Sequence, residues 1–236
     1  VGFVGATCAY TLAVSGLFSD LVLVDMNRAK AIGEASDINH GVAFSKPCRV
    51  MAGDYADLAE CGLIIIAAGA NQKPGESRLE LLGRNKGILS SIIAQLTAVN
   101  REAILLVVSN PVDVLTCLAQ QLSGFPAGRV LGSGTVLDTA RLKYLLGQRL
   151  GVDSRNVHAF IIGEHGDSEL AVWSSANISG ADLDDYCRIA GITEPADELS
   201  RIYEHVRDAA YQIIDSKGAT YYGIGMAVRR IAEAIV

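Results

Sequence analysis

Two short segments in the second half of the chain carry side chains that could move a proton and hold an anion. His165 lies in the glycine-flanked run Gly-Glu-His-Gly-Asp after an expected strand, where an imidazole can face a cleft and titrate near neutral pH. Asp138 and Arg141 are three residues apart at the start of a predicted helix, so their side chains share one face. Taken alone, the histidine would also fit a structural role, and Asp138 and Arg141 would also fit a surface ion pair.

The first residues of the chain have the features of a nucleotide-binding turn. Gly2 and Gly5 form the back half of a G-x-G-x-x-G pattern, whose glycines let the backbone approach a pyrophosphate at a helix N-terminus. Asp25 closes the next strand about 20 residues later, where a carboxylate accepts hydrogen bonds from an adenosine ribose. Because a carboxylate there repels a 2′-phosphate, NAD is favoured over NADP. The alternatives are a packing pair of glycines and a solvent-exposed carboxylate.

Helical patterns alternate with short aliphatic runs in the first part of the chain, as is typical of a parallel sheet covered on both faces. After Gly132 the pattern changes to longer helices around one strand. The expected strands are 21–24, 63–68, 104–109 and 157–162, and the expected helices are 8–16, 27–40, 82–100, 137–150, 197–217 and 225–236. We therefore expect an α/β fold, with a Rossmann-type doubly wound parallel sheet in an NAD-binding domain (1–133) and an α+β catalytic or substrate domain (134–236).

Composition and charge argue against several other classes of protein. Hydrophobic residues make up 50% of the chain and charged residues 19%, as in globular proteins. A net charge of -6 without a basic cluster argues against a nucleic-acid partner, and the aliphatic runs are too short to span a membrane. The five cysteines form no C-x-x-C pair, so we predict buried thiols in a reducing cytoplasm and no metal site.

Five motifs occur in order along the chain. They are Gly-Phe-Val-Gly at 2–5, Gly-Ala-Asn-Gln-Lys-Pro-Gly-Glu-Ser-Arg at 69–78, Ser-Asn-Pro-Val-Asp at 109–113, Gly-Ser-Gly-Thr at 132–135 with Leu-Asp-Thr-Ala-Arg at 137–141, and Gly-Glu-His-Gly-Asp-Ser at 163–168. Together they closely resemble the L-lactate dehydrogenases of the lactate/malate dehydrogenase family, particularly its bacterial branch. The resemblance covers all 236 residues. It implies reversible hydride transfer between NADH and pyruvate, giving L-lactate and NAD, as the last step of anaerobic glycolysis or fermentation.

The resemblance implies a role for each of the chemically active residues. His165 is expected to protonate the pyruvate carbonyl as the hydride arrives, and Asp138 to accept its other ring hydrogen. Arg141 is expected to bind the substrate carboxylate as a planar two-point fork. Arg78 resembles the arginine of a mobile loop, here 71–84, that polarises the carbonyl when the loop closes.

Three more residues are implied to line the substrate pocket. Asn110 is expected to hydrogen-bond the reacting oxygen, and Thr220 to lie beside the methyl group of the substrate. Gln72 occupies the position where malate dehydrogenases commonly have an arginine for a second carboxylate. A neutral amide offers no such charge pairing, and burying an unpartnered carboxylate is costly. This favours pyruvate and L-lactate over malate.

The resemblance also implies a set of NAD contacts, several of them through the backbone. Tyr55 and Ser91 would be ordinary surface residues without it. The implied contacts are Gly2, Val4, Gly5, Asp25, Lys30, Tyr55, Gly69, Ala70, Ser91, Val108, Ser109, Asn110 and Ser133.

Regulation and assembly stay open. Relatives that respond to fructose 1,6-bisphosphate have an arginine at the position of Lys143 and a histidine at that of His158. Lysine keeps the charge but loses the bidentate fork toward phosphate, which weakens the case for this effector. The resemblance implies a homotetramer or a dimer.

The pattern begins and ends inside the expected fold. A strand before Val1, which would be central in the sheet order 3-2-1-4-5-6, is expected but absent from the sequence, as are strands and a final helix after Val236. We hypothesise that the 236 residues belong to a longer chain. Two alternatives to the main reading are a dehydrogenase for bulkier 2-hydroxy acids (2-hydroxyisocaproate-like) or for malate, and a non-catalytic nucleotide-binding or structural homologue.

Overall fold

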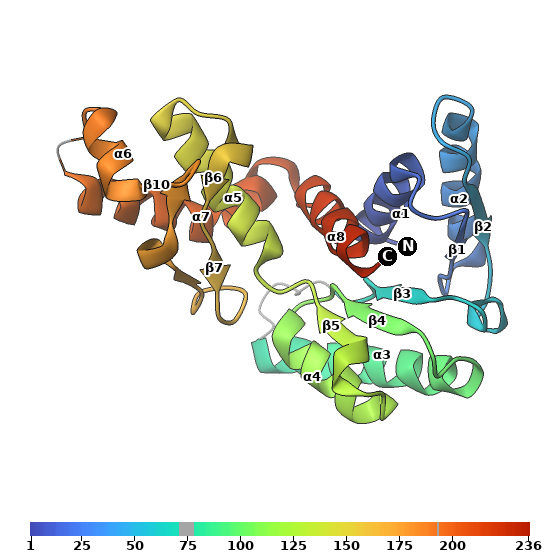
Figure 1. Ribbon diagram of the computed structural model, residues 1–236. Helices are drawn as coiled ribbons and strands as arrows, with labels where there is room; N and C mark the ends of the chain where they lie inside the picture. The colour runs from blue at the N-terminus through green and yellow to red at the C-terminus, as the bar shows by residue number, and fades with distance from the viewer. Residues whose placement is uncertain (71–77, 193) are drawn as a thin grey trace. The chain divides into compact units, whose positions relative to one another are not determined.

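The chain folds into two compact units in a computed structural model (Figure 1). Residues 1–70, 78–192 and 194–236 are described, with only the backbone for 78 and 79. Unit 1 comprises Val1–Ser133 and Tyr221–Val236, and unit 2 comprises Gly134–Thr220. By packing, the last 16 residues therefore belong with unit 1, whereas the sequence pattern placed them with the substrate domain. The functional division near residue 133 stays a proposal.

Unit 1 alternates helices with short parallel strands. Its helices are α1 (Phe3–Ser15), α2 (Arg28–Val42), α3 (Arg78–Val99), α4 (Val112–Ser123) and α8 (Tyr222–Ile235), with the 3-10 turns η1 (Ala56–Leu58) and η2 (Ala127–Arg129). Its strands are β1 (Asp20–Leu23), β2 (Arg49–Ala52), β3 (Leu63–Ile66), β4 (Ile104–Val107) and β5 (Val130–Gly132). Among the described residues, β1 pairs with β2, and β3, β4 and β5 form a second sheet in that order. The pairing is parallel throughout, which confirms the expected sheet type.

Strand β4 shows how the sheet is buried on both faces. Leu105 and Val107 belong to a core cluster with α3 and α4, whereas Leu106 packs in a cluster with α1 and α8. All three side chains are 0% exposed. Because successive side chains of a strand point to opposite faces, a continuous aliphatic run is what a doubly covered strand requires. Burying each side chain stabilises the fold by about 1.5–3 kcal/mol.

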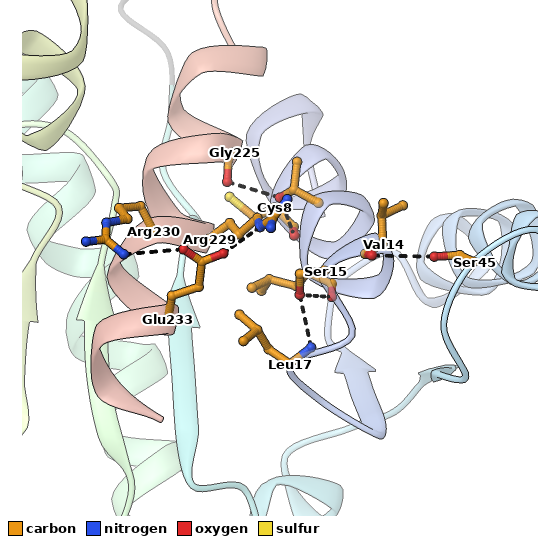
Figure 2. Close-up of polar contacts among 11 residues, drawn as sticks. Cys8, Val14, Ser15, Leu17, Ser45, Gly225, Arg229, Arg230 and Glu233 are labelled. Atoms are coloured by element: carbon orange, nitrogen blue, oxygen red, sulfur yellow. Dashed lines mark hydrogen bonds and ion pairs between the residues drawn. The ribbon is translucent and has the colours of Figure 1, made fainter. Parts of the chain in front are cut away.

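Helices α1 and α8 pack closely at the other face of this sheet (Figure 2). The Thr11 hydroxyl donates a hydrogen bond to the Gly225 carbonyl at 3.0 Å. A Cβ on Gly225 would lie 2.7 Å from Cγ2 of Thr7, so this close approach requires glycine. Burial raises the pKa of the Cys8 thiol to about 12, and Arg229 bonds Glu233 at 2.9 Å along α8. The Thr11–Gly225 hydrogen bond and the close approach of Gly225 to Thr7 join Tyr221–Val236 to helix α1 of unit 1.

Unit 2 combines helices with two small antiparallel sheets. Its helices are α5 (Val136–Leu150), α6 (Leu183–Ile189) and α7 (Pro195–Lys217), with the 3-10 turns η3 (Ser154–Asn156) and η4 (Trp173–Ser175). Its strands are β6 (Val157–His158), β7 (Ile161–Ile162), β8 (Leu170–Ala171), β9 (Asn177–Ile178) and β10 (Ala181–Asp182). One core cluster, which includes Leu142, Leu146, Val157 and Val206, joins α5 and α7 to these strands.

The single strand expected over 157–162 is two strands in the structure. Burial alternates through the whole segment, with Val157, Ala159 and Ile161 buried and the residues between them exposed. The partner changes midway, because β6 pairs with β9 and β7 pairs with β8. The period-2 pattern therefore identified the extended backbone correctly, but it carries no information about which strand is the partner.

The cysteines are free, as expected, but they are not all buried. Cys8, Cys48 and Cys187 are buried and Cys61 is half-buried, whereas Cys117 is exposed on α4. The prediction of five buried thiols is therefore wrong for Cys117, which lies outside the apolar face of its helix. Within 1–70, 78–192 and 194–236, no helix is both long and apolar enough to cross a membrane.

Candidate active site

Unit 2 brings His165, Asp138 and Arg141 into one hydrogen-bonded group. Nδ1 of His165 lies 2.6 Å from Oδ2 of Asp138, and Nη1 of Arg141 donates to Oδ1 of the same carboxylate at 2.8 Å. The Asp138 side chain is only 2% exposed, and those of Arg141 and His165 are 13% and 26% exposed. The aspartate–arginine pair is thus buried, and the surface ion pair that the sequence also allowed is excluded.

The first turn of α5 is fastened to the strand that leads into the histidine loop. The hydroxyl of Thr135 donates to the Ile161 carbonyl at 2.7 Å, and Thr139 accepts from the Ile161 N–H at 2.9 Å. Asp138 lies between these two threonines, in a helix turn whose positive end favours a carboxylate. The helix start and the histidine loop are therefore held in register, which fixes the distance between Asp138 and His165.

The loop around His165 depends on glycine at two positions. Gly163 has φ 92° and Gly166 has φ 125°, a backbone region that side-chain-bearing residues rarely adopt. These two glycines, one on each side of His165, turn the chain out of β7 and back into β8. The Gly-x-His-Gly pattern is therefore a backbone requirement for presenting the imidazole.

The group is arranged to keep a proton on the histidine. The hydrogen bond that the His165 ring donates to the Asp138 carboxylate raises the pKa of His165. Burial acts to raise the pKa of Asp138, but the hydrogen bond and charge of His165, together with Arg141, outweigh burial and leave that pKa below its usual value. Asp138 is thus ionised at neutral pH and orients the ring through Nδ1, which leaves Nε2 as the nitrogen that gains and loses a proton.

Glu169 is a buried acid beside this group that the sequence interpretation missed. It is 5% exposed, and its Oε1 has no hydrogen-bond partner among the residues that the structure describes. Polar atoms of Asp138, His165 and Glu169 all lie within 4.8 Å of one another. Since His165 and Arg141 already occupy both oxygens of Asp138, we interpret the cluster as a proton-transfer group. A charged residue four positions after the histidine, next to a strand, was the available signal.

The nucleotide end of unit 1 fits NAD. Gly2 is the N-cap of α1 with extended backbone, no side chain caps the helix, and its first turn has no acidic residue, so its N–H groups suit a pyrophosphate. Asp25 follows β1, and its Oδ1 accepts the Asn27 N–H at 2.8 Å. Lys30 lies in the first turn of α2, close in sequence to this carboxylate. A carboxylate at the end of β1 suits a ribose.

The loops after β3 and β4 are joined by a residue that the sequence interpretation did not single out. Oδ1 of Asn85 accepts the Ala70 N–H at 2.8 Å, and Nδ2 of Asn85 donates to the Asn110 carbonyl at 2.9 Å. Asn85 is 3% exposed, and the Ser109 hydroxyl adds a bond to the Ala68 carbonyl at 2.7 Å. The signal was an asparagine within the inward face of a largely aliphatic helix.

The remaining predicted residues are placed as follows. Several lie where backbone or partly buried contacts are available: Val4 is half-buried in α1, Tyr55 is half-buried before η1, Gly69 follows β3, Val108 and Ser133 are buried after β4 and β5, and Thr220 is half-buried before α8, whereas Ser91 is exposed on α3. Lys143 is half-buried in α5 and His158 is exposed in β6. Gln72 and the side chain of Arg78 lie outside the described residues.

Replacing Asn85 with leucine is expected to loosen both loops. The Ala70 N–H and the Asn110 carbonyl would lose their partners, which costs about 2–4 kcal/mol of unfolding free energy. We expect weaker NADH binding as well, to be measured by fluorescence titration beside urea unfolding. Gln95→Leu is the control, because Gln95 is exposed on the same helix and its side-chain amide donates to Ser91 one turn away. Equal losses in both variants would contradict a specific role for Asn85.

Comparisons with known proteins agree with this geometry. The NAD binding domain family of lactate/malate dehydrogenase matches residues 1–132, and the family described as lactate/malate dehydrogenase, alpha/beta C-terminal domain, matches residues 135–236. An L-lactate dehydrogenase of Acetivibrio thermocellus is 55% identical over 235 residues, spanning 100% of this chain and 74% of that protein. One of Thermoanaerobacter pseudethanolicus is 56% identical over 234 residues, spanning 99% of this chain and 75% of that protein.

Solved structures of lactate dehydrogenases also match the chain. The chain matches MGS-M5, a lactate dehydrogenase from a Medee basin deep-sea metagenome library, with a TM-score of 0.94 and 49% identity. It matches the minor L-lactate dehydrogenase of Enterococcus mundtii, solved in a ligand-bound form, with a TM-score of 0.96 and 44% identity. Each match covers 100% of this chain and 75% of the other. The chain therefore belongs to the lactate/malate dehydrogenase family, and its first 132 residues match that family's NAD-binding domain.

Proposed function

We propose that the chain is an L-lactate dehydrogenase that reduces pyruvate with NADH and a proton to give L-lactate and NAD, reversibly. The observation that carries the chemistry is the 2.6 Å contact between His165 and the buried Asp138. A histidine held this way is a general acid in one direction and a general base in the other, near neutral pH. The L-lactate dehydrogenases that are 55% and 56% identical to this chain support the choice of substrate.

In this proposal some residues bind the substrate and His165 transfers the proton. NAD, when bound, accepts or supplies the hydride. Arg141 bonds Asp138 through one nitrogen and keeps further N–H groups for the substrate carboxylate. His165 gives its proton to the carbonyl oxygen as reduction proceeds and takes it back in the oxidation of lactate. Asn110 and Arg78 stabilise that oxygen, a role that rests on the family resemblance.

Pyruvate is the preferred 2-oxo acid in this proposal. Gln72 offers no charge for a second carboxylate, and the family resemblance implies that Thr220 lies beside the methyl group. We expect kcat/KM for oxaloacetate to be at least about a hundredfold below that for pyruvate, since an unpaired buried charge costs about 3 kcal/mol. 2-Oxoisocaproate should fall between them. Steady-state assays of the three acids test this, and faster turnover of oxaloacetate or of 2-oxoisocaproate would favour malate or a bulkier 2-hydroxy acid as the product.

The proposal also covers the assembly, the regulation and the cellular location of the enzyme. We propose a homotetramer or a dimer acting in the cytoplasm at the last step of anaerobic glycolysis or fermentation, on the strength of the family resemblance. Lys143 lacks the arginine fork that suits phosphate, which weakens the case for fructose 1,6-bisphosphate as an activator. Repeating the pyruvate assay with the sugar bisphosphate decides it: a lower KM supports activation, and an unchanged KM removes it.

A further inference from the structure

Glu169 is a buried acid that the proposed mechanism does not use. Its backbone is fixed on two sides, because its N–H donates to the Gly166 carbonyl at 3.1 Å and its carbonyl accepts the hydroxyl of Tyr203 from α7. The carboxyl group is thereby held against Asp138 and His165. It is 5% exposed, so water contributes little to stabilising a charge on it.

The charges around this carboxyl group come from three segments. Helix α5 contributes Asp138 and Arg141, which are paired with each other at 2.8 Å. The histidine loop contributes His165. Helix α7 contributes Tyr203, whose pKa the charge of Glu169 acts to raise and the charge of Arg207 acts to lower. Since the arginine of α5 is balanced by Asp138, an ionised Glu169 is compensated mainly when His165 carries its proton.

The protonation of Glu169 and that of His165 are therefore linked. Burial raises the pKa of Glu169 to about 7, and the charge of Asp138 acts in the same direction. In turn, the charge of Glu169 adds to that of Asp138 in raising the pKa of His165. Because the two groups lie this close together, each responds to the charge of the other and they titrate as a coupled pair.

We propose that Glu169 is a positioning residue that sets the charge beside the Asp138–His165 pair and thereby the pH range in which His165 exchanges its proton. The inference rests on the proposed function. Above neutral pH, ionised Glu169 keeps His165 protonated, which pyruvate reduction needs. In more acidic solution Glu169 carries a proton of its own and adds no charge, so it has little influence there.

The test is the pH profile of Glu169→Gln in the full-length enzyme. We expect the alkaline limb of kcat/KM for pyruvate and the acid limb for lactate to move to lower pH by about one unit, with wild-type rates for pyruvate near pH 5.5. Glu169→Asp, which keeps the charge, should restore most of the wild-type profile. Glu164→Gln is the control, because Glu164 is exposed on the same loop and bonds Ser168. A uniform loss of rate with unmoved limbs would overturn the proposal.

A second readout does not depend on turnover. Diethyl pyrocarbonate acylates neutral histidine, so its rate at His165, with a His165→Asn sample as the baseline, reports the same titration. We expect the inflection to move to lower pH in Glu169→Gln, and an unmoved inflection would refute the inference. If the glutamine variant does not fold, Glu169→Met carries the same expectation. Failure of both uncharged variants beside a folded Glu169→Asp would make the charge structural and also overturn the proposal. Wild-type protein without pyruvate turnover would instead refute the proposed function.

Discussion

Turnover of pyruvate is expected to fall at least about a thousandfold when His165 is replaced by asparagine, while NADH binding is kept. Asparagine can still hydrogen-bond Asp138, but its amide neither gives nor takes a proton at neutral pH. The residues that we assign to NAD lie in the other compact unit of the chain. Steady-state kinetics and a fluorescence titration with NADH measure the two effects separately.

The matched control for this variant is His205→Asn. His205 is exposed on α7 and is expected to tolerate the change with wild-type turnover. Wild-type turnover in His165→Asn would refute the role of His165. A wild-type protein that binds NADH but turns over no 2-oxo acid would instead favour the non-catalytic alternative.

The sequence predicted those parts of the fold in which the type of each residue matches the burial of its own side chain. The strands at Leu63–Ile66 and Ile104–Val107 are aliphatic at every position because helices cover both faces. Strand β5 was missed because it has three residues and ends in Gly132, so it owes its conformation to pairing with β4. Strand β2 begins with an exposed arginine and depends in the same way on β1.

The residues of the candidate site also fall into those that local sequence predicts and those that it does not. His165, Asp138 and Arg141 were identified because their spacing and the family resemblance name them, and the structure brings them together. Asn85 and Glu169 were missed because the importance of each comes from being buried, at 3% and 5% exposure. Burial of a polar side chain depends on segments far away in the sequence, and local patterns therefore do not predict it.

Asp138→Asn is expected to damage both catalysis and stability. The amide can accept from only one of its two former partners, so either the His165 ring or the Arg141 guanidinium faces a donor. We expect kcat/KM for pyruvate to fall about 10²–10⁴-fold, as when a carboxylate that orients a catalytic histidine is lost. The alkaline limb should also move to lower pH, because the hydrogen bond that His165 donates to Asp138 is the main cause of the raised pKa of His165.

The loss of stability in this variant should depend on pH in a defined direction. The buried charge of Arg141 loses its partner, at a cost of about 3–5 kcal/mol. The lowered pKa of Asp138 means that its contribution is present above about pH 4 and lost as the pH falls through its folded pKa. The raised pKa of His165 means that its share is complete below about pH 6.5 and lost as the pH rises through its folded pKa. The difference from the wild type should therefore be largest between these two values.

Urea unfolding at about pH 3, 5.5 and 9 measures this dependence on either side of the two reference pKa values. Asp153→Asn is the control, because Asp153 also pairs with an arginine, Arg155, but on the surface, where solvent screens the pair. It should change neither the unfolding free energy nor the pH profile appreciably. If both aspartate variants lose the same stability at every pH, the Asp138 carboxylate is not the buried anchor of His165 and Arg141, and the geometry of the proton-transfer group must rest on other contacts.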